Sequence, residues 1–224
     1  MINENGNEHK NNQIQEYKFP YDTCEQKSTN TIAKQPYSTI IGIITCVLII
    51  VFIFLTKSLP TKLFFISLLI FESLHTYSHF RHIPGNKQVF TVHSTSYLVT
   101  LSFLFWVIRQ TKIYPSYGFV LLLGLIFCFD IYAFNYLPFI FYFISQTLLF
   151  SSILISYYSF FPKTLKQNIP IIILFILLVI MFEVNEIFNC RRMLDFFPYF
   201  PYHILVETPG LILFYIIAKS IYQL

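Results

Sequence analysis

Two pairs of metal-binding side chains recur at the same spacing in this sequence. His75 and His79 are four residues apart, and so are His203 and Glu207. In a helix this spacing places both members of a pair on one face. Two such pairs on neighbouring helices could surround one cation with nitrogen and oxygen ligands, for which zinc is the natural candidate. Zinc in such a site activates water near neutral pH, and a carboxylate such as Asp130 could accept its proton.

The helices that carry these pairs are expected to cross a membrane. The chain of 224 residues is 55% hydrophobic and only 12% charged, so a soluble domain of this size would lack the polar surface to cover its core. Apolar runs of about 20 residues, the length that crosses a bilayer, recur throughout residues 38–224. The expected spans are 38–56, 61–79, 89–108, 115–134, 137–161, 168–188 and 201–221. The prediction is an all-α membrane protein, a seven-transmembrane-helix bundle preceded by a polar N-terminal segment, residues 1–37.

Charge is distributed unevenly between the two faces of this predicted bundle. One face and the C-terminus hold basic residues and no acidic ones: Lys57, Lys62, Arg109, Lys112, Lys163, Lys166 and Lys219. The positive-inside tendency makes this face cytosolic, so the C-terminus is expected in the cytosol and the N-terminus in the lumen or outside the cell. Basic residues interleaved with aromatic ones do not form a block, which argues against nucleic-acid binding.

The ionisable residues of the membrane region are predicted to gather at the other face. Successive helices alternate in direction, and this places the following residues at one end of the bundle: Glu72, His75, His79, His93, Asp130, Glu183, Glu186, His203 and Glu207. Ionisable groups inside a membrane are costly, so they mark a function or a buried polar network. The alternative for each histidine pair is hydrogen bonding to neighbouring helices without a metal. Glu186 and Asp195 are expected to be solvated loop charges, and Trp106 an interfacial anchor.

Three segments of the chain share motifs with a known family. The N-terminal segment reads Asp22-Thr-Cys24-Glu25, followed by Ile-Ala-Lys-Gln-Pro-Tyr-Ser-Thr at 32–39. The second segment runs from Glu72 to His79, with Ser78 beside the histidine. The third contains Asn185-Glu-Ile-Phe-Asn-Cys190 and Pro201-Tyr-His203-Ile-Leu-Val-Glu207-Thr-Pro-Gly210. These segments resemble motifs of the alkaline ceramidases and of the wider CREST superfamily of seven-helix membrane hydrolases, which also contains the progestin and adiponectin receptors.

The sequence departs from this family at several positions that bind metal or lie beside it. Glu207 stands where the family has its last histidine, and His75 stands where the family has a serine. Asn185 replaces an aspartate. The family's aspartate in the third helix has no clear counterpart, since Thr91 and His93 occupy that region. The resemblance therefore implies a metal site with altered ligands.

The resemblance implies a zinc-dependent hydrolase of lipid amides, with ceramide as the candidate substrate, entering laterally from the bilayer. Zinc would be held by His79, His203 and Glu207, with His75 or His93 as a further ligand. The residues that would take part in catalysis are Asp130, Glu72 and Ser78, of which Asp130 or Glu72 would move protons.

The resemblance also assigns roles near the N-terminus. Asp22 and Glu25 fall where alkaline ceramidases have acidic calcium ligands, which makes calcium a candidate second cofactor. Cys24 and Cys190 correspond to the family's paired cysteines, and a disulfide between them is expected on the lumenal side.

Two other classes of function stay open at the level of sequence. The altered ligands favour a receptor or scaffold that kept the fold and lost hydrolysis. An ion or proton transporter would also place acids and histidines in a membrane. The confinement of these residues to one end of the bundle argues against a transporter, because no comparable polar path continues to the basic face.

Overall fold

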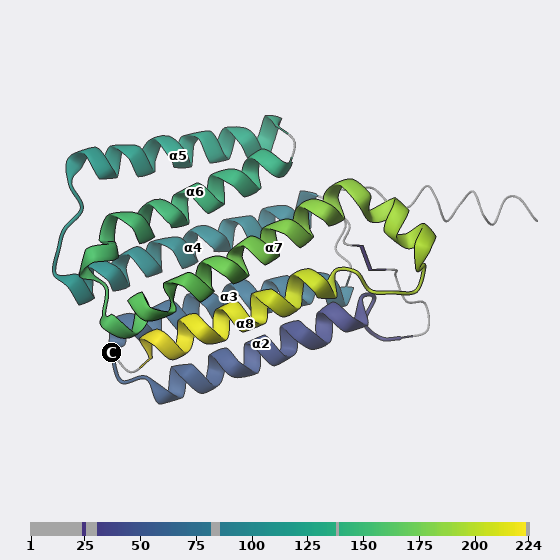
Figure 1. Cartoon of the computed structure of the whole chain (residues 1–224), viewed down its shortest axis with the longest axis horizontal. Coiled ribbons are helices and arrows are strands. Elements are labelled where there is room, and N and C mark those ends of the chain that lie inside the picture. Colours follow the sequence, from purple (N-terminus) through teal and green to yellow (C-terminus); the bar gives the residue numbers. More distant parts are fainter. Residues whose placement is uncertain (1–23, 26–30, 82–85, 138, 223–224) are drawn as a thin grey trace, which may run out of the picture.

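The computed structural model describes residues 24–25, 31–81, 86–137 and 139–222, which form helices joined by short non-helical segments and contain no strand. The α-helices within these ranges are α2 (Pro36–Leu55), α3 (Leu59–Arg81), α4 (Asn86–Thr111), α5 (Tyr117–Tyr136), α6 (Phe139–Tyr157), α7 (Lys163–Phe196) and α8 (Ile204–Ile221), and a short 3-10 helix, η1, spans Tyr158–Phe160. The helices run roughly parallel and antiparallel to one another in a single bundle (Figure 1). An all-helical fold is therefore confirmed for the described residues.

Helix α2 packs against both α3 and α8, the helices where the two predicted ligand pairs lie. In addition, α3 packs against α4, α4 against α6, α5 against α6, and α7 against α8. The carboxyl ends of α3, α5 and α7 and the amino ends of α4, α6 and α8 lie at one end of the bundle (Figure 1). The segment before α2 is attached at this end, because the N–H groups of Lys34 and Gln35 donate to the carbonyls of Phe80 and His79, at 3.0 and 3.2 Å.

Three of the described helices, α2, α7 and α8, are long and apolar enough to cross a membrane, with mean hydropathies of 2.9, 2.6 and 1.7 in their most apolar windows. These helices indicate a membrane protein. Helix α3 is not among them, because Glu72, His75 and His79 make it more polar. The outer helix α5 has a shorter apolar stretch, Tyr117–Ala133. Its side chains Leu121 and Leu125 are 65% and 60% exposed, which suits contact with lipid rather than water.

The apolar core fills the end of the bundle opposite the histidines. Its largest fully buried side chains include Phe65, Phe103 and Trp106, which come from the start of α3 and the end of α4. The expectation that Trp106 is an interfacial anchor was wrong. Its side chain is 0% exposed, and its indole N–H donates to the Thr61 hydroxyl at 3.1 Å. Burial of the ring in the core and this hydrogen bond together fix its position.

Helix α7 is longer than the apolar run that predicted it. The expected span was 168–188, but the helix continues to Phe196 and has 34 residues. Between Pro170 and Pro198 the sequence contains no further proline and no glycine, so the backbone has no reason to leave the helix where hydropathy falls. Pro198 disfavours helical backbone at Phe197, and the helix ends there. The additional turns include Cys190. The predicted span, which ended at residue 188, placed this cysteine in the loop after the helix.

The predicted disulfide between Cys24 and Cys190 is present, and it joins the N-terminal segment to α7. The next residue, Glu25, is buried against the first turn of α2. Its carboxylate accepts hydrogen bonds from the Tyr37 N–H at 2.9 Å, the Ser38 N–H at 3.1 Å and the Ser38 hydroxyl. A carboxylate at a helix N-terminus satisfies free backbone N–H groups and the positive end of the helix dipole. Glu25 therefore fastens the N-terminal segment to the bundle.

Candidate metal centre

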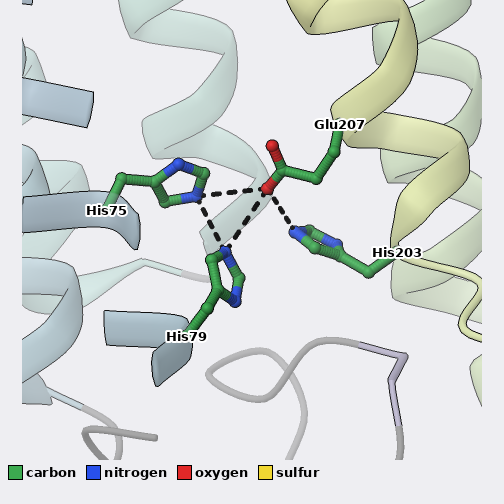
Figure 2. Close-up of side chains that lie close together, drawn as sticks. All are labelled: His75, His79, His203 and Glu207. Carbon is green, nitrogen blue, oxygen red and sulfur yellow. Dashed lines mark hydrogen bonds and ion pairs between the residues drawn. The ribbon is translucent and has the colours of Figure 1, made fainter. Parts of the chain in front are cut away.

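The two ligand pairs predicted from the sequence, His75/His79 and His203/Glu207, meet between α3 and the start of α8 (Figure 2). Three imidazole Nε2 atoms converge on one oxygen of Glu207. The distances to Glu207 Oε1 are 3.0 Å from His203, 3.3 Å from His79 and 3.5 Å from His75. The Nε2 atoms of His75 and His79 are 3.1 Å apart. The ligand atoms of all four side chains lie within 4.8 Å of one another. We call these four residues the His–Glu group.

Two of the imidazoles have their other ring nitrogen engaged outside the group. Nδ1 of His79 lies 2.8 Å from the side-chain oxygen of Gln35, and Nδ1 of His203 lies 2.9 Å from Oε2 of Glu186. Because both of these oxygens accept, Nδ1 is the donor in each case. A neutral imidazole has one N–H, so its Nε2 then carries a lone pair directed at Glu207. Metal-binding histidines in proteins have this arrangement, with the outer nitrogen donating to a carboxylate or an amide oxygen.

The third imidazole is arranged similarly but more loosely. Nδ1 of His75 lies 3.7 Å from Oε2 of Glu72, one turn earlier on α3. His75 is also more exposed than His79, with side-chain exposures of 24% and 1%. All three histidines therefore have an oxygen acceptor on their outer side and a nitrogen facing Glu207.

This arrangement directs lone pairs of several acceptors at one point, which is unfavourable unless positive charge lies among them. A metal cation would satisfy all four side chains at once, whereas protons on the rings would satisfy them in pairs. The dimensions suit a tetrahedral ion, because four ligands at zinc–nitrogen distances are about 3.3 Å from one another. Of the six separations in such a set, four are 3.0, 3.1, 3.3 and 3.5 Å, close to that value, and all six are within 4.8 Å. The residues present therefore fit a zinc-sized ion.

Glu186 belongs to the surroundings of this site, contrary to the expectation of a solvated loop charge. It lies on α7, its side chain is 4% exposed, and it accepts from His203. Its other oxygen accepts a hydrogen bond from the backbone N–H of Cys24. With Glu183 and His203 it forms a second group whose ligand atoms lie within 4.8 Å of one another. The prediction failed because the inward face of α7 at Glu186 is covered by Cys24 of the N-terminal segment and by His203.

The three residues predicted to be catalytic occupy different positions. Glu72 lies beside His75, as described above. The hydroxyl of Ser78 donates to the His75 carbonyl at 2.6 Å, within α3. Asp130, on α5, is in neither group of convergent ligands. It accepts from the Tyr97 and Ser145 hydroxyls and from Nε2 of Gln146, the last at 2.9 Å. The structure thus brings Glu72 to the His–Glu group and places Asp130 in a network between α4, α5 and α6.

For two of the predicted site residues the structure describes no side chain. Asp22 lies outside the described residues, and His93 lies in the first turns of α4, where the side chains are not described. Glu25, the other candidate calcium ligand, has both carboxylate oxygens engaged by the start of α2. Calcium binding therefore stays a prediction.

Sequence reasoning missed Gln35, which is 2% exposed and orients His79. It falls in the polar N-terminal segment, where a glutamine carries no signal of its own. Glu186 did have a usable signal, since it precedes Cys190 by four residues and therefore shares its helix face. The Cys24–Cys190 disulfide brings that face against the N-terminal segment.

Comparison with known proteins leaves the functional interpretation to the residues described above. Searches against protein-family models, curated proteins and solved structures found no match to this chain.

Proposed function

We propose that this chain is a zinc-dependent membrane hydrolase of the CREST type that cleaves a lipid amide such as ceramide. The observation that carries the proposal is the convergence of three imidazole Nε2 atoms, from His75, His79 and His203, on one oxygen of Glu207. The buried acceptors around these rings support a metal site rather than an accidental cluster.

The exchange of ligands relative to the family is compensated within the His–Glu group. Glu207 replaces a family histidine, but His75 adds an imidazole that the family lacks at that position. The group therefore keeps three imidazoles, and the carboxylate becomes an additional oxygen ligand or base. This balance supports a working site with altered chemistry over the remnant of a lost one.

In this proposal all seven described helices cross the bilayer, with the His–Glu group at the lumenal or extracellular end. The disulfide between Cys24 and Cys190 supports this orientation, because disulfides persist in oxidising compartments. The basic residues at the opposite end support it independently. A lipid substrate would reach the site laterally, and the apolar outer surfaces of helices such as α5 suit that route.

The chain's own residues would divide the work as follows. His75, His79, His203 and Glu207 would hold the metal, and Gln35 and Glu186 would keep two of the imidazole rings in orientation. Bound zinc supplies Lewis-acid activation of an amide carbonyl and of water. Proton transfer falls to the carboxylates that lie against the imidazoles, Glu207 and Glu72.

In the proposed enzyme, Ser78 and Asp130 would stabilise the arrangement of the helices. The Ser78 hydroxyl binds the backbone of α3 beside His75. Asp130 binds donors from α4 and α6, so it would hold three helices together.

The test is to purify the full chain, measure its zinc content by mass spectrometry, and assay a panel of N-acyl lipids in proteoliposomes. The wild type should contain stoichiometric zinc and release fatty acid, and His203→Ala and Glu207→Ala should lose both properties. Asp195→Ala is the matched control, since Asp195 is an exposed acid on α7 outside the His–Glu group. Hydrolysis that survives both site substitutions would remove this mechanism.

A non-catalytic receptor or scaffold is the second candidate, and one observation favours it. Structural zinc sites are closed by four protein ligands, whereas catalytic ones keep a position open. The His–Glu group offers four ligand atoms within 4.8 Å of one another, so all four could bind one ion and close the site. Stoichiometric zinc without turnover of any lipid in the panel would identify this alternative.

A further inference from the structure

A continuous set of contacts connects the disulfide to the His–Glu group. The backbone N–H of Cys24 donates to one oxygen of Glu186, and Nδ1 of His203 donates to the other at 2.9 Å. Nε2 of His203 then faces Glu207 at 3.0 Å. Cys24 is held in place by its bond to Cys190, which lies one helical turn after Glu186 on α7.

These contacts are shielded from water. The exposed fractions of Cys24, Glu186 and Cys190 are 0, 3 and 4%. When a buried carboxylate loses a hydrogen-bond donor, water does not readily replace that donor. The loss of free energy is therefore larger than for a carboxylate at the surface. The position of the Cys24 N–H therefore matters to the orientation of Glu186, and through it to that of His203.

We propose that the Cys24–Cys190 disulfide sets the metal affinity of the His–Glu group through Glu186, which acts as a positioning residue. The inference rests on the proposed function only in requiring that the group binds zinc. With the disulfide formed, Cys24 holds Glu186 against Nδ1 of His203, and Nε2 stays directed into the group. With the disulfide broken, the segment that carries Cys24 loses its covalent attachment to α7, and His203 loses an orienting contact.

The redox step is a simple exchange. A water-soluble phosphine supplies two electrons to the disulfide and takes an oxygen atom from water, becoming a phosphine oxide. The two protons of that water end on the sulfur atoms of Cys24 and Cys190, which become thiols. In a cell, a thiol reductant would do the same and would itself become a disulfide.

Linkage makes the effect reciprocal. If breaking the disulfide lowers zinc affinity by some factor, zinc binding must make the disulfide harder to reduce by the same factor. A tenfold change in affinity corresponds to a shift of about 30 mV in the reduction midpoint of this two-electron couple. This second readout does not depend on any enzymatic activity.

The experiment measures zinc affinity of the purified full chain by competition with a chromophoric chelator. Glu186→Gln should weaken binding by about 10- to 100-fold, the usual effect of removing a partner that orients a ligand. Cys24→Ser with Cys190→Ser should weaken it by about tenfold, within the range of typical coupling energies. Combining the cysteine substitutions with Glu186→Gln should weaken it no further than Glu186→Gln alone, because both act through one contact.

Two matched variants separate this coupling from general effects. Glu183→Gln removes a glutamate one turn earlier on α7, so a loss of affinity equal to that of Glu186→Gln would attribute the effect to charge and overturn the inference. Cys128→Ser changes an exposed free cysteine and should leave affinity unchanged. Additive losses from Glu186→Gln and the cysteine pair, or equal reduction midpoints with and without zinc, would also overturn it.

The outcomes distinguish this inference from the proposed function. A wild-type chain that binds no zinc contradicts both. A wild-type chain that binds zinc with equal affinity in its oxidised and phosphine-reduced forms contradicts the coupling alone. Absence of lipid hydrolysis contradicts only the proposed enzyme.

Discussion

Asp130 on α5 and Glu207 on α8 are both carboxylates withdrawn from water, but the groups around them differ in kind. Asp130 is 0% exposed and is surrounded by donors, namely two hydroxyls and the amide of Gln146. Glu207 is surrounded by imidazole nitrogens, and the rings of His79 and His203 spend their N–H groups on Gln35 and Glu186. The described contacts of Asp130 come from donors, whereas those of Glu207 come from a group that could hold a metal ion.

The chemistry of a buried acid depends on the hydrogen-bonding roles of its neighbours. The donors around Asp130 come from α4 and α6, so their hydrogen bonds to this carboxylate on α5 join three helices. The imidazoles around Glu207 form a group that could hold a metal ion. Both residues lie near the same end of the bundle, and sequence position alone would have treated them alike.

The largest effect should separate the two carboxylate sites by metal content. His79→Ala removes a central ligand and should abolish stoichiometric zinc, because its Nε2 contacts both His75 and Glu207. Asp130→Asn should retain zinc, since the network around Asp130 holds no ligand of the His–Glu group. Metal analysis after gel filtration checks both variants. Loss of zinc in Asp130→Asn would show that the two carboxylate sites are not independent.

Substitutions at the two sites should differ in whether the protein is still stabilised by zinc. Zinc at 100 times its dissociation constant stabilises the wild type by about 2.7 kcal/mol, so a chelator should lower its melting temperature. Asp130→Ala leaves three donors without their acceptor and should cost about 1–3 kcal/mol. That variant should keep the full zinc-dependent increment, whereas Glu207→Ala should lose it. An unchanged melting temperature of the wild type after chelation would contradict this prediction.

The glutamines beside the two carboxylate sites offer a matched pair of variants. Gln35→Leu removes the acceptor of His79 Nδ1 and should weaken zinc binding by about tenfold. Gln146→Leu removes a donor to Asp130 and should lower stability by about 1 kcal/mol with zinc affinity unchanged. Chelator competition and thermal unfolding on the same preparations measure both quantities. Equal effects of the two variants on zinc affinity would contradict the assignment.

The smallest effect is expected at the apolar end. Trp106→Phe removes one buried hydrogen bond to Thr61 and should cost about 0.5–1.5 kcal/mol. Zinc affinity should not change, because the indole lies in the core at the end of α4 and away from the His–Glu group. Circular dichroism must follow the unfolding, since Trp106 is the single tryptophan of the chain. A change in zinc affinity here would show that packing at one end controls the site at the other.

The spacing of residues along the sequence predicted much of the candidate site. The pairs His75/His79 and His203/Glu207 follow from helical periodicity, and their meeting follows from alternating helix directions. The Cys24–Cys190 pairing came from resemblance and is present in the structure. The membrane character came from composition, and α2, α7 and α8 bear it out.

The sequence by itself determined which residues share a helix face, because that depends only on the 3.6-residue turn, and it determined that the chain is helical and apolar. Only the tertiary structure decided the partner of each ionisable group. It assigned Gln35 and Glu186 to the imidazoles, hydroxyl donors to Asp130 and the Cys24 N–H to Glu186. These contacts join residues from 15 to 162 positions apart. A donor and an acceptor at such separation leave no periodic pattern along the chain, and they meet only once the helices have packed.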